Sequence, residues 1–231
     1  RAVALSSKMS GIKAHIVMPT NAPTVKKNST IGYSANVIDC PPTLKDREET
    51  LQKVIDQTGA SAMHPYNDMD VIEGNSTATM ELLEDYPDLD AIFAPIGGGG
   101  LISGACLAAK YFSNAKVYGA EPEGADDAYR SFQKGEIIPM VNPQTIADGL
   151  RTSLGEIGFE IMKTHLDSIF TVSESEIISA MKWMWQKMKI IIEPSSAVPL
   201  AALIKNHELF KDQQVGIIIS GGNVDLDNLP F

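Results

Sequence analysis

Residues 89–104, LDAIFAPIGGGGLISG, join a short apolar run, a run of glycines and a second apolar run. Residues 91–94 are almost wholly apolar, which is typical of a strand buried on both faces of a parallel sheet. The glycines are Gly97, Gly98, Gly99 and Gly100. Because none of them carries a side chain, their N–H groups can approach an anion closely. A helix predicted from about Leu101 would add free N–H groups and its positive dipole end. The stretch therefore predicts a strand, a phosphate-binding loop and a helix.

Two common nucleotide-binding loops do not fit this spacing. No Lys-Ser or Lys-Thr pair follows the glycines, which excludes a P-loop. A dinucleotide-binding loop needs glycines at n, n+2 and n+5. Counted from Gly98 the last of these positions is Ser103, and counted from Gly99 the middle one is Leu101. The spacing favours a phosphorylated cofactor other than ATP or NAD. A glycine-rich turn that only lets strand and helix pack closely is the alternative.

The composition is that of an ordinary soluble globular protein, with 44% hydrophobic and 21% charged residues among 231. A formal charge of −10 opposes binding to a nucleic acid. Residues 91–109 carry no charge, but Pro95 and the glycines argue against a membrane span. No targeting segment is visible after Arg1, and Cys40 and Cys106 are expected to be buried free thiols. We expect a cytoplasmic protein without nucleic-acid or membrane partners.

Helices and strands alternate over the first part of the chain. Predicted helices cover residues 2–9, 25–30 and 44–58, and predicted strands cover residues 13–18 and 35–39. This alternation is typical of a three-layer parallel sheet. The His-Pro-Tyr-Asn-Asp sequence at residues 64–68 has turn chemistry and predicts a boundary. We therefore expect part of a small domain at residues 1–66 and part of a large, cofactor-binding domain at residues 67–231.

The second part of the chain continues the α/β pattern. Predicted helices cover residues 74–84, 177–188 and 193–203, and predicted strands cover residues 91–94, 116–120 and 215–219. Ser173 and Glu176 have the spacing of a capping box, which places a helix start just after them. Residues 135–147 are interrupted by prolines and are expected to run over the surface.

Polar residues follow two of these strands. Ser220 comes directly after the last strand, at the carboxyl end where open α/β sheets bind ligands, although a plain turn explains Ser-Gly-Gly equally well. After the strand at 116–120, Glu121 and Asp127 with one loop carbonyl could bind a hard divalent cation. A solvated acidic loop is the alternative. The four histidines are scattered, and no two have zinc spacing.

Several segments in a fixed order resemble a known family. They are GIKAHIVMP at 11–19, HPY at 64–66, PIGGGGL at 95–101, AEP at 120–122 with ADD at 125–127, TIADG at 145–149, IEP at 192–194 and SGGNVD at 220–225. Together they resemble the serine racemase and serine/threonine dehydratase group of fold type II pyridoxal-phosphate enzymes. The resemblance implies two three-layer α/β/α domains with mainly parallel sheets, incomplete at the N-terminus, and a homodimer.

The resemblance also implies the roles of individual residues. The backbone of the four glycines and Leu101 would hold the cofactor phosphate. Ser220 would bond the pyridine nitrogen with a neutral hydroxyl, which keeps that nitrogen largely unprotonated. Gly149 and Glu193 match positions that line the ring, and Tyr66 would wall the pocket. The resemblance also implies a structural or activating Mg²⁺, Mn²⁺ or Ca²⁺ site. Its ligands would be Glu121, Asp127 and the carbonyl of Ala125.

Two family segments have no counterpart in these residues. One is the Ser-Phe-Lys-x-Arg-Gly segment with the Schiff-base lysine, and the other is the Ser-Gly-Asn-His segment that holds the substrate carboxylate. We therefore assign no catalytic residue within this chain and expect none of its lysines to form a specific Schiff base. The implied activity is dehydration or racemisation of serine, threonine or a related small hydroxy amino acid. The alternatives are a truncated, non-catalytic chain that binds a phosphorylated cofactor, and a cysteine-synthase-like β-replacement enzyme.

Overall fold

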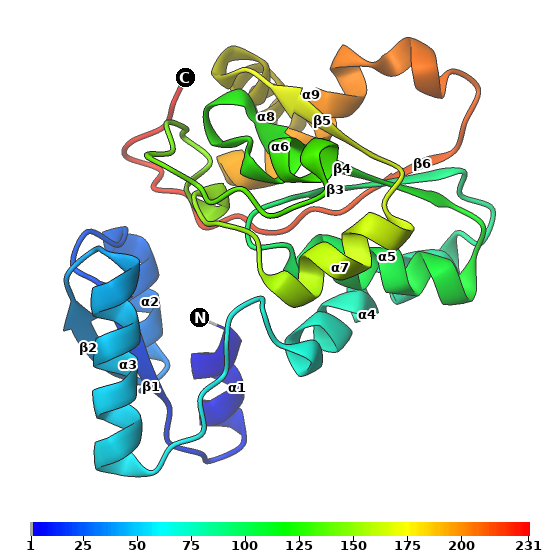
Figure 1. Ribbon diagram of the computed structural model, residues 1–231. Helices are drawn as coiled ribbons and strands as arrows, with labels where there is room; N and C mark the ends of the chain where they lie inside the picture. Colours follow the sequence, from blue (N-terminus) through cyan, green and yellow to red (C-terminus); the bar gives the residue numbers. More distant parts are fainter. Residues whose placement is uncertain (1) are drawn as a thin grey trace. The chain divides into compact units, whose positions relative to one another are not determined.

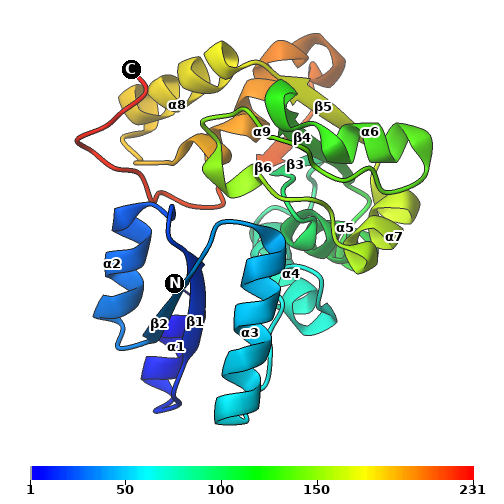
Figure 2. The same cartoon turned by 60° about the vertical axis from the view of Figure 1, so that its left-hand side comes forward.

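The computed structural model describes residues 2–231, and the chain divides into two compact units between Met63 and His64. The smaller unit contains a parallel pair of strands, β1 (His15–Pro19) and β2 (Asn36–Cys40). Its helices are α1 (Ala2–Met9), α2 (Thr24–Gly32) and α3 (Leu44–Thr58). Figure 2 shows the two strands side by side, with α2 and α3 beside them. Because α2 connects two parallel neighbours, the unit contains a β-α-β crossover.

The larger unit is built on four parallel strands in the order β5-β4-β3-β6. Their bounds are β3 (Ala91–Pro95), β4 (Lys116–Pro122), β5 (Ser168–Val172) and β6 (Val215–Ile217). The helices are α4 (Met69–Asp85), α5 (Gly100–Phe112), α6 (Asp127–Lys134), α7 (Glu156–His165), α8 (Glu174–Met188) and α9 (Pro194–Lys205). Short 3-10 turns are η1 (Glu123–Ala125), η2 (Asp148–Leu150) and η3 (His207–Phe210).

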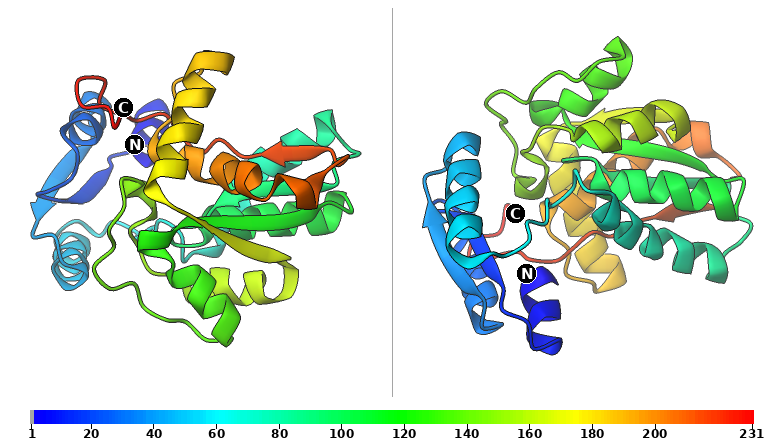
Figure 3. Two further views of the ribbon diagram at one scale, coloured as in Figure 1. Left: turned by 90° about the horizontal axis from the view of Figure 1, so that it is seen from above. Right: turned by 60° about the horizontal axis from the view of Figure 1, so that its bottom comes forward.

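Two hydrophobic cores lie on opposite faces of the four-stranded sheet, because successive strand residues point to opposite sides. Phe93 of β3 belongs to the core that includes residues of α8 and α9, whereas its neighbour Ile92 belongs to the core that includes residues of α5 and α7. Figure 1 shows these helix pairs above and below the strands, and the left view of Figure 3 looks down on the α8–α9 face. The larger unit is therefore a three-layer structure.

The predicted α/β class with parallel sheets is confirmed, and so is the strand, glycine loop and helix at residues 89–104. The helix predicted from residue 74 begins earlier, at Met69, because Asp68 caps it by accepting from the N–H groups of Asp70 and Val71. The last strand ends at Ile217, two residues earlier than predicted. Among the α-helices and strands, three were not predicted, namely α6, α7 and β5.

Within residues 2–231, no helix combines the length and the apolar character needed to cross a lipid bilayer.

Candidate functional site

The candidate site lies at the carboxyl edge of the four-stranded sheet. All of its strand pairs are parallel, so the segments that follow β3, β4 and β6 emerge at the same edge. These segments contain the glycine loop, the acidic loop and Ser220 respectively. Open α/β sheets bind ligands at this edge, where several loops from distant parts of the sequence meet.

The glycine loop leads directly into the N-terminus of α5. Gly99 is the N-cap and has a φ of +92°, a left-handed conformation that favours glycine. A Cβ on Gly97 would lie 2.9 Å from the carbonyl oxygen of Gly149, and one on Gly98 would collide with the ring of Tyr66. Close packing therefore explains why side chains are missing at Gly97 and Gly98. The N-terminal N–H groups of α5 still give this loop the chemistry of an anion site.

Gly149 lies between the glycine loop and the start of α9. Its N–H donates to the hydroxyl of Ser195 at 3.1 Å, and its carbonyl oxygen faces Gly97. Ser195 is buried in the first turn of α9. The structure thus places Gly149 beside the glycine loop. Gly97 and Ser195, the two residues that it contacts, are each about fifty residues away from it in the sequence.

A second group of contacts surrounds Ser220. The Oγ atoms of Ser196 and Ser220 are 2.9 Å apart, and Ser196 Oγ also contacts the carbonyl oxygen and the N–H of Gly221, each at 2.7 Å. Glu193 donates its N–H to the Gly221 carbonyl at 3.1 Å, and its carboxylate lies where a Gly221 side chain would be. Glu193 and Ser220, predicted separately from sequence, therefore belong to one cluster.

Ser195 and Ser196 were missed by the sequence analysis. Both are buried, and each bonds a predicted site segment, Gly149 in one case and Ser220 in the other. The available signal was a pair of hydroxyls at the start of an otherwise apolar, uncharged stretch, residues 195–204. Buried hydroxyls need hydrogen-bond partners, so such a pair indicates polar contacts to another segment.

Two buried carboxylates flank the acidic loop, by which we mean the segment from the end of β4 to the first turn of α6. Glu121 lies in β4, which extends beyond the predicted strand, and Asp127 is the first residue of α6. Glu121 is fully buried and accepts from the N–H groups of Ala128 at 3.2 Å and Tyr129 at 2.7 Å in the first turn of α6. Asp127 is also fully buried. One of its oxygens accepts from Leu154 N–H at 3.2 Å, and the other, Oδ1, has no hydrogen-bond partner among the described residues. The loop is therefore not the solvated acidic loop of the alternative interpretation.

Burial makes the charged forms of these carboxylates unfavourable. Burial and then the nearby charge of Asp127 raise the pKa of Glu121 well above its usual range. Burial also raises the pKa of Asp127 to about 6. Because ionisation of both buried carboxylates is unfavourable, a nearby cation would stabilise their charged forms.

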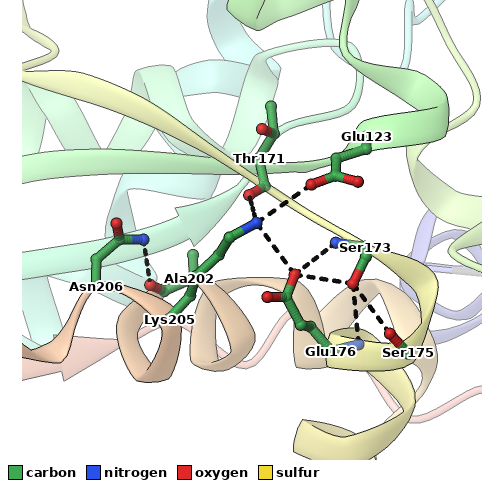
Figure 4. Close-up of polar contacts among 8 residues, drawn as sticks. All are labelled: Glu123, Thr171, Ser173, Ser175, Glu176, Ala202, Lys205 and Asn206. Atoms are coloured by element: carbon green, nitrogen blue, oxygen red, sulfur yellow. Dashed lines mark hydrogen bonds and ion pairs between the residues drawn. The ribbon is translucent and has the colours of Figure 1, made fainter.

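Lys205 supports the acidic loop from α9 (Figure 4). Its Nζ lies 3.2 Å from Glu123 of η1, 3.2 Å from Glu176 at the start of α8, and 3.1 Å from the carbonyl of Thr171 in β5. Glu176 also completes the predicted capping box with Ser173. Lys205 of α9 therefore forms polar contacts with three other elements, η1, β5 and α8.

Other metal chemistry finds no support in the described part of the chain. No group of three His, Cys, Asp or Glu side chains there could hold a metal ion, so a cation at the acidic loop would need backbone oxygen or water as well. Cys40 and Cys106 are free and buried, as predicted. Burial raises the pKa of the Cys106 thiol to about 12, which makes it a poor nucleophile.

Comparison with known proteins identifies the family of the chain. Residues 1–221 match the family described as pyridoxal-phosphate dependent enzyme. The chain is 47% identical over 227 residues to the beta-hydroxyaspartate dehydratase of Paracoccus denitrificans, covering 98% of this chain and 72% of the relative. It is 48% identical over 236 residues to the serine racemase of Dictyostelium discoideum, covering 99% and 72%. The solved structure of the T.th. threonine deaminase has a TM-score of 0.91 at 40% identity and covers 97% and 74%. The chain therefore belongs to the family of pyridoxal-phosphate dependent enzymes.

Proposed function

We propose that this chain acts on serine, threonine, 3-hydroxyaspartate or a related hydroxy amino acid, converting it to a 2-oxo acid and ammonia, racemising it, or both. The observation that carries the proposal is the identity of 47–48%, over nearly the whole chain, to a dehydratase and a racemase of such amino acids. The threonine deaminase with the same fold supports the same substrate class. When bound, pyridoxal phosphate supplies an electron sink for the α-carbon of the amino acid.

The residues at the carboxyl edge fit that cofactor. The glycine loop offers backbone N–H groups without side chains, and Leu101 lies in the first turn of the helix that follows it. These residues would hold the phosphate. Gly149 and Glu193 would line the ring, with Tyr66 packed against the glycine loop. Ser220 would meet the pyridine nitrogen with a neutral hydroxyl. Unlike a carboxylate, this hydroxyl would not favour protonation of the nitrogen, so the ring would be a weaker electron sink.

We also propose that the acidic loop binds Mg²⁺, Mn²⁺ or Ca²⁺ through Glu121, Asp127 and the carbonyl of Ala125. The unpartnered Oδ1 of Asp127 and the full burial of both carboxylates support this proposal. All three donors are oxygens, which hard divalent cations prefer. The cation would hold the loop after β4 in place rather than take part in the reaction at the ring.

The proposed activity is tested with the full-length protein loaded with pyridoxal phosphate. Serine, threonine and both 3-hydroxyaspartate diastereomers are supplied in each enantiomer. Release of 2-oxo acid measures elimination, and chiral chromatography of the remaining amino acid measures racemisation. We expect at least one substrate to give a product. If O-acetylserine with sulfide gives cysteine while no hydroxy amino acid reacts, the β-replacement alternative replaces this proposal. A homodimer and a cytoplasmic location stay predictions, the first of which light scattering of the same sample tests.

A further inference from the structure

Two consecutive residues, Leu154 and Gly155, connect the acidic loop to the glycine loop. The N–H of Leu154 donates to Oδ2 of Asp127 at 3.2 Å, and the N–H of Gly155 donates to the carbonyl oxygen of Gly98 at 3.0 Å. All four residues are buried. Because a buried polar group without a partner is costly, both bonds constrain the segments that they join. Adjacent backbone N–H groups thus link a proposed cation ligand to the proposed phosphate loop.

The side chain of Leu154 also packs against the glycine loop. A Cβ on Gly99 would lie 3.3 Å from Cδ2 of Leu154 and 3.9 Å from the Cα of Gly158 in α7. The hydroxyl of Ser103 in α5 donates to the carbonyl oxygen of Gly158 at 3.1 Å, which joins the first turns of α5 and α7. These contacts mean that the glycine loop cannot shift without disturbing residues 154–158.

The bond from Gly155 fixes the orientation of one peptide group in the glycine loop. The carbonyl of Gly98 and the N–H of Gly99 belong to the same trans peptide, in which the two groups point in opposite directions. With the carbonyl held toward Gly155, the N–H of Gly99 points away from it. Gly99 is the N-cap of α5, and the first N–H groups of a helix have no acceptor within it. Gly155 therefore determines where one free N–H of the loop points.

We propose that Leu154 and Gly155 couple the two sites, so that a divalent cation at Asp127 raises the affinity of the glycine loop for a phosphorylated cofactor. This inference rests on the proposed function, in which Asp127 binds the cation and the glycines hold the phosphate. Oδ1 of Asp127, which has no partner among the described residues, can bind the cation while Oδ2 keeps its bond to Leu154. The cation then holds the carboxylate, and the carboxylate holds residues 154–155 against Gly98.

The direction of the coupling follows from ordering. A glycine loop that is already held in place loses less conformational freedom when it binds a phosphate, so the phosphate binds more tightly. Linkage is reciprocal, so a bound phosphate raises the affinity for the cation by the same factor.

The first experiment measures amide hydrogen exchange in the full-length protein without cofactor, in the absence and presence of Mg²⁺. We expect Mg²⁺ to slow exchange at Leu154 and Gly155 by a larger factor than at Gly149. The amide of Gly149 is the internal control, because it donates to Ser195 in the same unit and not to Asp127. A factor at Leu154 and Gly155 no larger than that at Gly149 would overturn the proposal.

The second experiment measures the dissociation constant of pyridoxine 5′-phosphate by calorimetry, with and without Mg²⁺. This compound carries the phosphate but has no aldehyde, so it cannot form a Schiff base. We expect Mg²⁺ to lower the dissociation constant by about fivefold or more, the range of coupling between sites. The dissociation constant of pyridoxine, which lacks the phosphate, should not change. No effect on either compound, or an equal effect on both, would overturn the proposal.

Two substitutions at Gly155 isolate its bond to Gly98. Gly155 has a φ of −82°, close to the value that proline requires, and Gly155→Pro removes the N–H. Gly155→Ala is the matched control, because a Cβ here meets the side chain of Asn67 in both variants but alanine keeps the N–H. We expect Gly155→Pro to lose most of the Mg²⁺ effect on pyridoxine 5′-phosphate and Gly155→Ala to keep it. Retention of the effect in Gly155→Pro, or equal loss in both variants, would overturn the role of this bond. If Gly155→Pro does not fold, the exchange experiment decides.

The same titrations separate this inference from the proposed function. If pyridoxine 5′-phosphate and Mg²⁺ both bind but neither changes the affinity for the other, the two proposed sites stand and only the coupling is wrong. If Mg²⁺ does not bind, the proposed cation site at Asp127 is wrong, and the coupling falls with it.

Discussion

At the scale of single residues, Gly97 shows how a missing side chain keeps two loops of the site together. A Cβ at this position would lie 2.9 Å from the backbone oxygen of Gly149 and 3.3 Å from the Cα of Leu150. Backbone atoms cannot rotate away as a side chain can. We therefore expect Gly97→Ala to separate the two loops, to destabilise the protein by about 1–3 kcal/mol, and to weaken pyridoxal-phosphate binding. Denaturant unfolding and cofactor absorbance measure the two effects.

Gly74→Ala is the matched control for this prediction. Gly74 lies inside α4, and a Cβ there would meet no described atom within 4 Å. Alanine lowers the conformational entropy of the unfolded chain and has a higher helix propensity than glycine. Gly74→Ala should therefore stabilise the protein by about 0.5–1 kcal/mol. If Gly97→Ala is as harmless as Gly74→Ala, the two loops are not in contact as described.

Asp127 carries the second prediction at this scale. Mg²⁺ at about 100 times its dissociation constant should stabilise the unsubstituted protein by about 2.7 kcal/mol, because only the folded loop binds it. Asp127→Ala should lose this stabilisation. Asp126→Asn should keep it, since Asp126 pairs with Arg130 at 2.8 Å and is not one of the proposed ligands. Thermal unfolding with and without Mg²⁺ makes the comparison. Equal stabilisation of all three proteins would place the cation elsewhere.

At the scale of secondary-structure elements, Lys205 connects four of them. Burial opposes its charge, but hydrogen bonds to Glu123 and Glu176 raise the pKa of Lys205 overall. Burial likewise opposes the charge of Glu176, and its bonds to Ser173 and Lys205 lower the pKa of Glu176 overall. The side chains are about one-third exposed, so solvent screens the pairs. We expect Lys205→Met to destabilise the protein by about 0.5–1 kcal/mol at pH 7.

The pH dependence of this difference gives the sharper measurement. A raised lysine pKa contributes stability that is present below the unfolded value of about 10.4 and lost as pH rises through the folded value. A lowered glutamate pKa contributes stability that is present above about 4.3 and lost as pH falls through the folded value. The difference between Lys205→Met and the unsubstituted protein should therefore be largest from about pH 5 to pH 10. Lys110→Met, at an exposed lysine of α5 that forms no ion pair with a described residue, should show no such window.

Some elements could be predicted from sequence because their signals are local. β3 is apolar on both faces and is followed at once by the glycines that open α5, so a short window contains the whole pattern. β5 has only five residues and one strand neighbour, β4, and its burial alternates weakly. α7 begins at Glu156, and its N-cap residue, Gly155, has no side chain that could cap it. Both are placed by packing against the rest of the sheet, and no local signal in the sequence marks them.

At the scale of the whole molecule, the site residues that could be predicted have a local sequence signal, and the missed ones depend on contacts between distant segments. The glycine loop, Asp127 and Ser220 each follow a recognisable strand, and Glu121 lies near the end of one, so their position at the carboxyl edge could be predicted. Ser195 and Ser196 enter the site through contacts that span 46 and 24 residues of sequence. Such contacts depend on how α9 packs against the sheet, and only the three-dimensional structure reveals them.

The last prediction concerns how these distant segments respond together to the cofactor. If the glycine loop holds the phosphate and Ser220 meets the ring, pyridoxal phosphate should slow amide hydrogen exchange at two separate stretches, residues 97–101 and residues 220–221. Pyridoxal, which lacks the phosphate, should protect residues 220–221 alone when it is supplied at a concentration that saturates the ring site. Exchange mass spectrometry with overlapping peptides resolves the two stretches. Equal protection of residues 97–101 by pyridoxal would mean that this loop contacts the ring, because a loop that binds only the phosphate has nothing to bind in the unphosphorylated compound.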